Sequence, residues 1–153
     1  MEVNVKISFK GDYALKIILD LALNYQRGLV QISDIAKRQD IPLKYLEQIL
    51  LVLKGAGYVR SKRGPKGGFW LAKHPREITL GEIIRLMQGP TSPITCVSTS
   101  AYSKCRDEPK CPFRGLWLEI KEAINRVVDY TTFEDMVKRV IQMQDKESLV
   151  YMI

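Results

Sequence analysis

The 153-residue sequence predicts a mainly α-helical fold, a winged helix-turn-helix with a small β-hairpin wing, followed by a long dimerisation helix. Three features predict it: two short helical segments joined by a tight turn, a glycine-rich basic hairpin after them, and a helical segment with two apolar stripes. The length suits one domain, or one domain with an oligomerisation element. With 46% hydrophobic and 27% charged residues, the chain has the composition of a globular protein with a core.

Three helices are expected in the first third of the chain. Apolar residues at helical spacing predict a helix over residues 9–24, and Ser33 is expected to cap a short second helix that ends at Gln39. Pro42 then opens a third helix with one apolar face, formed by Leu46, Ile49, Leu50 and Leu53. Its opposite face is mainly polar and carries Lys44, Glu47, Gln48 and Leu51.

The segments after the third helix show equally local signals. Residues 58–63 and 69–72 are rich in β-forming residues and flank a glycine-rich tip, which predicts a hairpin. Thr79 and Glu82 form a capping box that begins a fourth helix, which ends before Gly89. A fifth helix is expected over residues 113–130 and a sixth after residue 132.

The fifth helix carries two apolar stripes. One stripe steps by four and three residues, as in a coiled coil, through Leu116, Ile120, Ala123, Val127 and Tyr130. The adjacent stripe consists of Trp117, Ile124 and Val128. We expect one stripe to pack on its own domain and the other on a second subunit.

Three divisions follow from these signals. Residues 1–88 are expected to form the winged helix-turn-helix domain, and residues 114–153 the dimerisation helix and a C-terminal helix. Between them, residues 89–113 lose helical periodicity, accumulate prolines and contain all three cysteines, so we expect a long sensor loop.

Charge is distributed unevenly along the chain. Residues 1–74 contain nine Lys and four Arg against six acidic residues, so the whole net charge of +7 lies there. Such an imbalance favours a polyanionic partner, and a DNA major groove admits an α-helix with polar outward side chains. The candidate DNA-binding residues are Lys44, Tyr45, Glu47, Gln48, Arg60, Lys62, Arg63 and Lys66. The alternative is an ordinary solvated surface.

Cys96, Cys105 and Cys111 are the candidate metal ligands. Three thiolates in one loop favour an iron–sulfur cluster, while a thiol redox role, a zinc site or no special role remain alternatives. The paired C-x-x-C spacing that is common in zinc sites is absent from the sequence.

Several functional classes fit the sequence poorly. The single histidine, His74, and the absence of a phosphate-binding glycine motif from the sequence argue against an enzyme. No apolar run approaches the roughly 18 residues of a membrane span, and three cysteines do not suit a secreted disulfide scaffold, so we expect a cytoplasmic protein. An RNA-binding adaptor or enzyme accessory protein is the rival from another class.

Four motifs resemble the Rrf-two-type family of bacterial regulators, which includes IscR, NsrR and CymR. They are the segment 7–23 with G-D-Y-A-L, P-L-K-Y-L-E-Q-I-L at 42–50, R-G-P-K-G-G-F at 63–69 and I-T-L-G-E-I-I at 78–84. The resemblance covers about residues 4–143. It implies a homodimeric repressor or activator that binds a palindromic DNA operator. It also implies that Lys44, Glu47 and Gln48 lie on the recognition helix and contact bases, and that Arg63 enters the minor groove.

The same resemblance implies a sensor. Cluster-binding members carry a 4Fe-4S or 2Fe-2S cluster on three cysteines, so the resemblance implies sensing of iron–sulfur status, oxygen or nitric oxide through Cys96, Cys105 and Cys111. IscR-like members add a histidine where this chain has Arg114, whereas NsrR-like members use an aspartate of the partner subunit at the position of Asp12. The stretch at 89–93 is more similar to CymR, which has no cluster, so switching by thiol oxidation or by a partner protein is the alternative.

Overall fold

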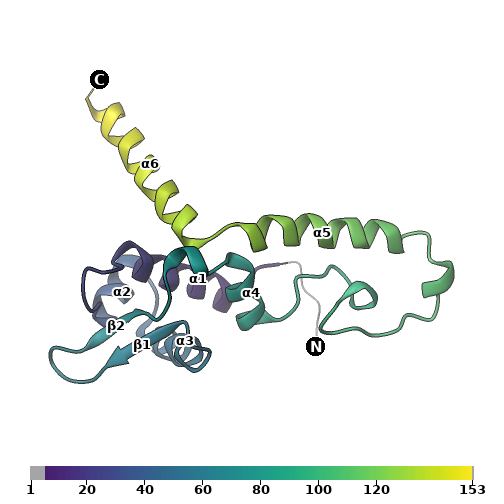
Figure 1. The fold of residues 1–153 in the computed structure, drawn as a ribbon, viewed down its shortest axis with the longest axis horizontal. Helices are drawn as coiled ribbons and strands as arrows, with labels where there is room; N and C mark the ends of the chain where they lie inside the picture. Colours follow the sequence, from purple (N-terminus) through teal and green to yellow (C-terminus); the bar gives the residue numbers. More distant parts are fainter. Residues whose placement is uncertain (1–5, 153) are drawn as a thin grey trace.

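The computed structural model describes residues 6–152, so residues 1–5 and 153 of the predicted divisions lie outside the described part. The α-helices are α1 (Phe9–Leu23), α2 (Ile32–Gln39), α3 (Leu43–Gly55), α4 (Leu80–Gln88), α5 (Arg114–Tyr130) and α6 (Phe133–Tyr151). Strands β1 (Val59–Lys62) and β2 (Gly68–Leu71) form an antiparallel hairpin, and three short 3-10 helices are η1 (Pro75–Glu77), η2 (Thr95–Val97) and η3 (Glu108–Lys110). The element order confirms the predicted mainly α class with a two-stranded wing (Figure 1).

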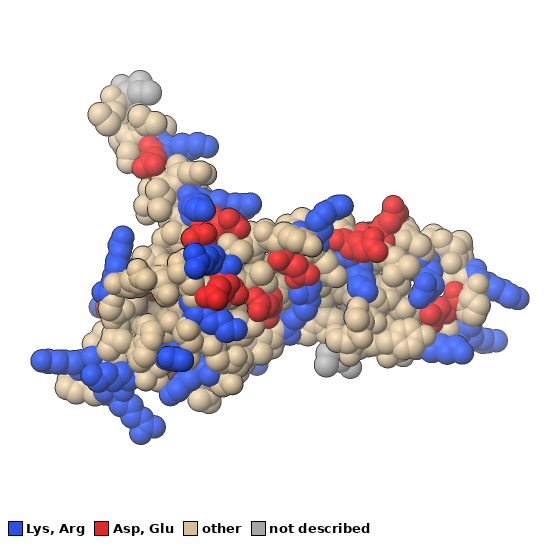
Figure 2. Space-filling model, viewed as in Figure 1, with Lys and Arg blue, Asp and Glu red and all other residues tan. Residues whose placement is uncertain are grey.

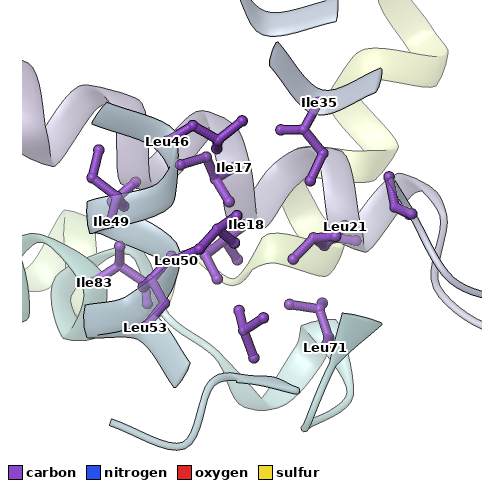
Figure 3. Close-up of a cluster of buried hydrophobic side chains, with 14 of the residues drawn as sticks. Ile17, Ile18, Leu21, Ile35, Leu46, Ile49, Leu50, Leu53, Leu71 and Ile83 are labelled. Atoms are coloured by element: carbon purple, nitrogen blue, oxygen red, sulfur yellow. The ribbon is translucent and has the colours of Figure 1, made fainter. Parts of the chain in front are cut away.

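The core of the N-terminal half lies between α1 and the elements packed around it. Side chains from α1, α2, α3, α4 and β2 converge there (Figure 3). The buried members labelled in the figure are Ile17, Ile18, Leu21, Ile35, Leu46, Ile49, Leu50, Leu53, Leu71 and Ile83. The predicted apolar face of α3 therefore supplies four of these residues.

One carboxylate is buried in this half and fixes α2 against α1. Asp20 is 2% exposed and accepts hydrogen bonds from Arg38 Nε at 2.9 Å, Arg38 Nη2 at 2.8 Å and Gln39 Nε2 at 3.1 Å. The hydrogen bonding to Asp20 raises the pKa of Arg38. Since an unpaired buried charge is costly, this fork specifies how the two helices pack.

The prediction that Ser33 caps the N-terminus of α2 is wrong. Ser33 lies inside the first turn, and Gln31 takes the N-cap position without a side-chain hydrogen bond. The reason is tertiary: Val30 pairs with Phe69 of the wing through two backbone hydrogen bonds of 2.9 and 2.8 Å, which holds the chain extended up to Gln31. The helix begins where this pairing stops.

The last two helices extend away from the core (Figure 1). No residue of α5 is buried, and in α6 only Phe133 is buried among the described residues. A capping box begins α6, because Thr132 Oγ1 accepts from Asp135 N at 3.2 Å and Asp135 Oδ2 accepts from Thr132 N at 2.9 Å. The helix continues to Tyr151, so the apolar residues Leu149, Val150 and Tyr151 are helical and exposed.

None of the helices within residues 6–152 combines the length and apolar character needed to cross a bilayer.

Candidate nucleic-acid interface and cysteine segment

Helix α3 presents a free face opposite its buried one. Lys44, Tyr45, Glu47 and Gln48 are exposed, as predicted for residues that would enter a groove. The helix starts after Pro42, which lacks a backbone N–H and sits at the N-cap with φ −56°. The structure therefore separates an apolar face that holds the core from a polar face that is available to a partner.

The hairpin beside α3 carries the expected cations. Within β1, Val59 is buried while Arg60 and Lys62 are exposed, which is the alternation of a half-buried strand. Arg63 and Lys66 are exposed at the tip. Figure 2 shows Lys and Arg side chains gathered at the end of the molecule where Figure 1 places the hairpin, whereas acidic side chains lie mainly toward α5 and α6.

The close glycine spacing of the wing tip has a steric cause. Gly64 has φ +108°, in the region that favours glycine. A Cβ on Gly67 would collide with the carbonyl oxygen of Lys62, and Gly67 N donates to Gly64 O at 2.9 Å. The tip is thus a tight turn with the backbone packed on itself and its basic side chains outside.

Sequence reasoning missed the contacts that brace this wing. Lys54 Nζ at the end of α3 donates to Ser61 Oγ of β1 at 2.7 Å. Gln31 Nε2 lies 3.5 Å from Pro65 O and 3.4 Å from Gly67 O. The Gln31 contacts span 34 and 36 positions and carry no local signal, so only the fold reveals that the start of α2 braces the wing tip, while Lys54 joins α3 to β1.

Aromatic residues of this region serve packing. Phe69 is partly buried against the core. Lys73 Nζ lies over the Tyr58 ring, 4.9 Å from its centroid, and the Tyr58 hydroxyl lies 3.4 Å from Glu82 Oε1. Burial and the neighbouring Glu82 carboxylate raise the pKa of Tyr58. Lys73, which follows the wing, therefore covers an aromatic ring.

The three cysteines lie in different environments. Cys96 is buried in η2, Cys105 is exposed, and Cys111 is half-buried before α5. Within residues 6–152, no three His, Cys, Asp or Glu side chains are grouped closely enough to hold a metal ion. Asp12 is paired instead with Lys16 Nζ at 2.8 Å on α1. A single protomer therefore does not bring the four predicted ligands together.

Arg114, the first residue of α5, has a structural contact. Its Nε lies 3.4 Å from Glu108 Oε1, and Tyr102 Oη donates to Glu108 Oε2 at 2.8 Å. The bond from Tyr102 lowers the pKa of the Glu108 carboxyl, and the same bond raises the pKa of Tyr102. Arg114 thus links η3 to the start of α5.

A polar-faced helix beside a braced basic hairpin defines a DNA-binding protein of the winged helix-turn-helix class. Residues 7–139 match the model of the Rrf2 family, described as an iron-dependent transcriptional regulator. The chain belongs to this family of transcription regulators, which confirms both the resemblance and the prediction that it is not an enzyme.

Two named relatives support the assignment. HTH-type transcriptional regulator CymR of Bacillus subtilis (strain 168) is 38% identical over 132 residues, covering 86% of this chain and 89% of CymR. HTH-type transcriptional regulator IscR of Pectobacterium atrosepticum is 32% identical over 145 residues, covering 94% of this chain and 87% of IscR.

Solved structures agree with the fold. The structure of B. subtilis CymR, the global cysteine regulator, matches with a TM-score of 0.76 at 38% identity, covering 88% of this chain and 97% of that one. The T. potens IscR structure matches with a TM-score of 0.73 at 35% identity, covering 91% and 90%. The winged-helix prediction is confirmed.

Proposed function

We propose that this regulator acts as a homodimer in the cytoplasm and binds a palindromic operator in double-stranded DNA. The observation that carries the proposal is the exposure of all eight candidate residues on α3 and the wing, two elements that the Lys54–Ser61 hydrogen bond joins. In this proposal Lys44, Tyr45, Glu47 and Gln48 face base edges, since a major groove accepts a helix with such side chains. The wing cations Arg60, Lys62, Arg63 and Lys66 hold the backbone or enter the minor groove.

The proposed dimer contact is the outer stripe of α5. Leu116, Val127 and Tyr130 are 47%, 63% and 82% exposed in the protomer. On the adjacent stripe Trp117 and Ile124 are half-buried. Most helical stability in proteins comes from the packing of an apolar face, so an apolar stripe left uncovered by its own chain favours a second copy.

Selection from a randomised pool of DNA duplexes tests whether the protein binds a palindromic operator. We expect the protein to enrich a two-fold symmetric sequence with half-sites about one helical turn apart, because a two-fold dimer mirrors its operator. RNA of the enriched sequence should compete weakly. Equal competition by RNA would favour the adaptor alternative, and an enriched sequence without symmetry would contradict the dimer.

We propose the cysteine-bearing segment, residues 89–113, as the sensor, joined to a DNA-binding division of residues 1–88 and a dimerisation division of residues 114–153. A cluster on Cys96, Cys105 and Cys111 is one form of this proposal, supported by the family description and by three thiols in one segment. A bound cluster would supply iron that reacts with oxygen or nitric oxide. The cysteines as placed do not fit it: Cys96 is buried while Cys105 is exposed, so the segment would have to rearrange.

Asp12 of the partner subunit is the proposed fourth ligand of such a cluster. Its carboxylate is about half exposed and held by Lys16, so ligation would require that this pair open. Asp12→Asn, purified anaerobically, should lose iron relative to wild type. Unchanged iron content and visible spectrum in this variant would remove Asp12 from the ligand set.

Thiol oxidation is the second form of the sensor, favoured by the exposure of Cys105 and by the separation of the three thiols. Anaerobic purification followed by iron and acid-labile sulfide analysis separates the two forms. Stoichiometric iron and sulfide would support the cluster. A metal-free protein whose DNA affinity changes on mild oxidation, and not in Cys105→Ser, would support the thiol form.

A further inference from the structure

A cluster of polar side chains joins α4 to α5 where the long helix leaves the core. Arg85 of α4 forms a two-pronged ion pair with Asp129 of α5, with Nη1 at 2.5 Å from Oδ1 and Nη2 at 3.0 Å from Oδ2. Such fork contacts fix orientation as well as distance. The two side chains are only about one-third exposed, so solvent screens the pair less than a fully exposed one.

Two further side chains complete the cluster. Arg85 Nη2 also donates to Asn125 Oδ1 at 2.8 Å, and Thr91 Oγ1 donates to the same oxygen at 2.8 Å. Asn125 and Asp129 are one turn apart and share a face of α5. Gly81 allows the close approach, because a Cβ there would collide with the Asp129 carboxylate. We call Arg85, Asn125, Asp129 and Thr91 the α4–α5 clamp.

A second attachment lies at the C-terminal end of α5. Leu80 N donates to Thr131 O at 3.0 Å, and Phe133 N donates to Ile78 O at 3.0 Å. These backbone bonds hold the position of the helix end, and the clamp holds α5 again at residues 125 and 129. Two separated attachments define a direction, so the clamp sets the angle at which α5 leaves the DNA-binding half.

We propose that the α4–α5 clamp is a positioning device that sets the spacing of the two DNA half-sites this protein recognises. The inference rests on the proposed dimer contact through α5. A rotation of about 10° at the clamp would move the far end of the helix at Arg114, about 20 Å away, by roughly 3.4 Å. That displacement equals the rise of about one base pair.

The clamp also contains the start of the proposed sensor segment. Thr91 is buried and lies five positions before Cys96, and Lys121 Nζ of α5 donates to Thr99 Oγ1 at 2.9 Å. A rearrangement of the segment would therefore pull on the contacts that aim α5. A merely structural ion pair would instead contribute to stability without affecting the preferred spacing.

The test compares half-site spacing in wild type, Asp129→Asn and Arg85→Lys, each used as the full-length dimer. The operator enriched from the duplex pool is resynthesised with its half-sites moved by −1, 0, +1 and +2 base pairs, and affinities are measured by fluorescence anisotropy. Glu134→Gln, which removes the Glu134–Lys138 ion pair within α6, is the matched control.

We expect both clamp variants to keep the half-site sequence and to lose preference for the wild-type spacing, by roughly 3- to 30-fold relative to the shifted duplexes. Glu134→Gln should keep the wild-type profile. Arg85→Lys keeps the positive charge but cannot form the two-pronged contact with Asp129. It therefore still tests the inference if Asp129→Asn folds poorly. Folded, dimeric clamp variants with an unchanged spacing profile would overturn the inference, whereas failure of wild type to select a two-fold sequence would instead count against the proposed dimer.

Discussion

The two halves of the chain differ in how completely they bury their apolar residues. The elements from α1 to α4 surround a shared core in which α1 and α3 alone contribute most of the fully buried side chains. In contrast, α5 buries no residue, and the described residues of α6 after Val140 are all exposed. The first half therefore holds nearly all of the core, to which α6 adds Phe133, whereas the rest of the second half presents apolar surface that another chain can cover.

The largest effect is expected where this surface meets a partner. Val127→Glu leaves the protomer intact, because Val127 is 63% exposed, but places a charge in the proposed seam. An unpaired buried charge costs about 3–5 kcal/mol, so the dimer should dissociate and operator binding should fall steeply. Light scattering and anisotropy measure both. Ile120→Glu should also weaken the dimer, whereas Met143→Glu on α6 is the control and should leave it unchanged. If the Val127→Glu protein remained a dimer, the interface would have to lie elsewhere.

Truncating one buried and one exposed leucine compares the packing of the two halves. Leu46→Ala should lower the free energy of unfolding by about 3 kcal/mol, because the side chain is fully buried between α3 and α1. Leu149→Ala on α6 should change it by less than about 0.5 kcal/mol. Urea unfolding monitored by circular dichroism compares them. Similar losses in the two variants would mean that the C-terminal half is as tightly packed as the first.

Base-reading residues should change specificity rather than stability. Glu47→Ala and Gln48→Ala remove exposed side chains, so melting temperatures should hold while discrimination at one operator position falls by roughly 1–3 kcal/mol. Binding to the operator and to single-base variants measures this. If both variants lost affinity equally on specific and random duplexes, α3 would not be the recognition helix.

Replacing wing cations should give the smallest change in DNA affinity, and this change should not depend on the DNA sequence. Lys62→Ala and Lys66→Ala should weaken all duplexes alike and reduce the slope of log affinity against log salt by about 0.9 each, since a phosphate contact carries no base information. Lys146→Ala on α6 is the control. A sequence-dependent loss for Lys66→Ala would mean that the wing reads bases.

Local patterns predicted the elements that carry local signals. The capping box of Thr79 and Glu82 appears as expected, and the outer residues of α3 are exposed because their inner neighbours are buried. The misses have long-range causes. The pairing of Val30 with Phe69 moved the start of α2, and the Arg85–Asp129 contact joins residues 44 positions apart. Cysteine spacing likewise did not predict that Cys96 would be buried away from Cys105.

Hydroxyl-radical footprinting on the selected operator tests the proposed dimeric reading most directly. If each protomer reads with its α3 and wing and pairs through α5, both strands will show protection related by two-fold symmetry, centred about one helical turn apart. Lys66→Ala should weaken protection in both halves together. A single protected patch, or two patches without symmetry, would contradict the idea that the DNA-binding half is paired through the exposed apolar surface of the C-terminal half.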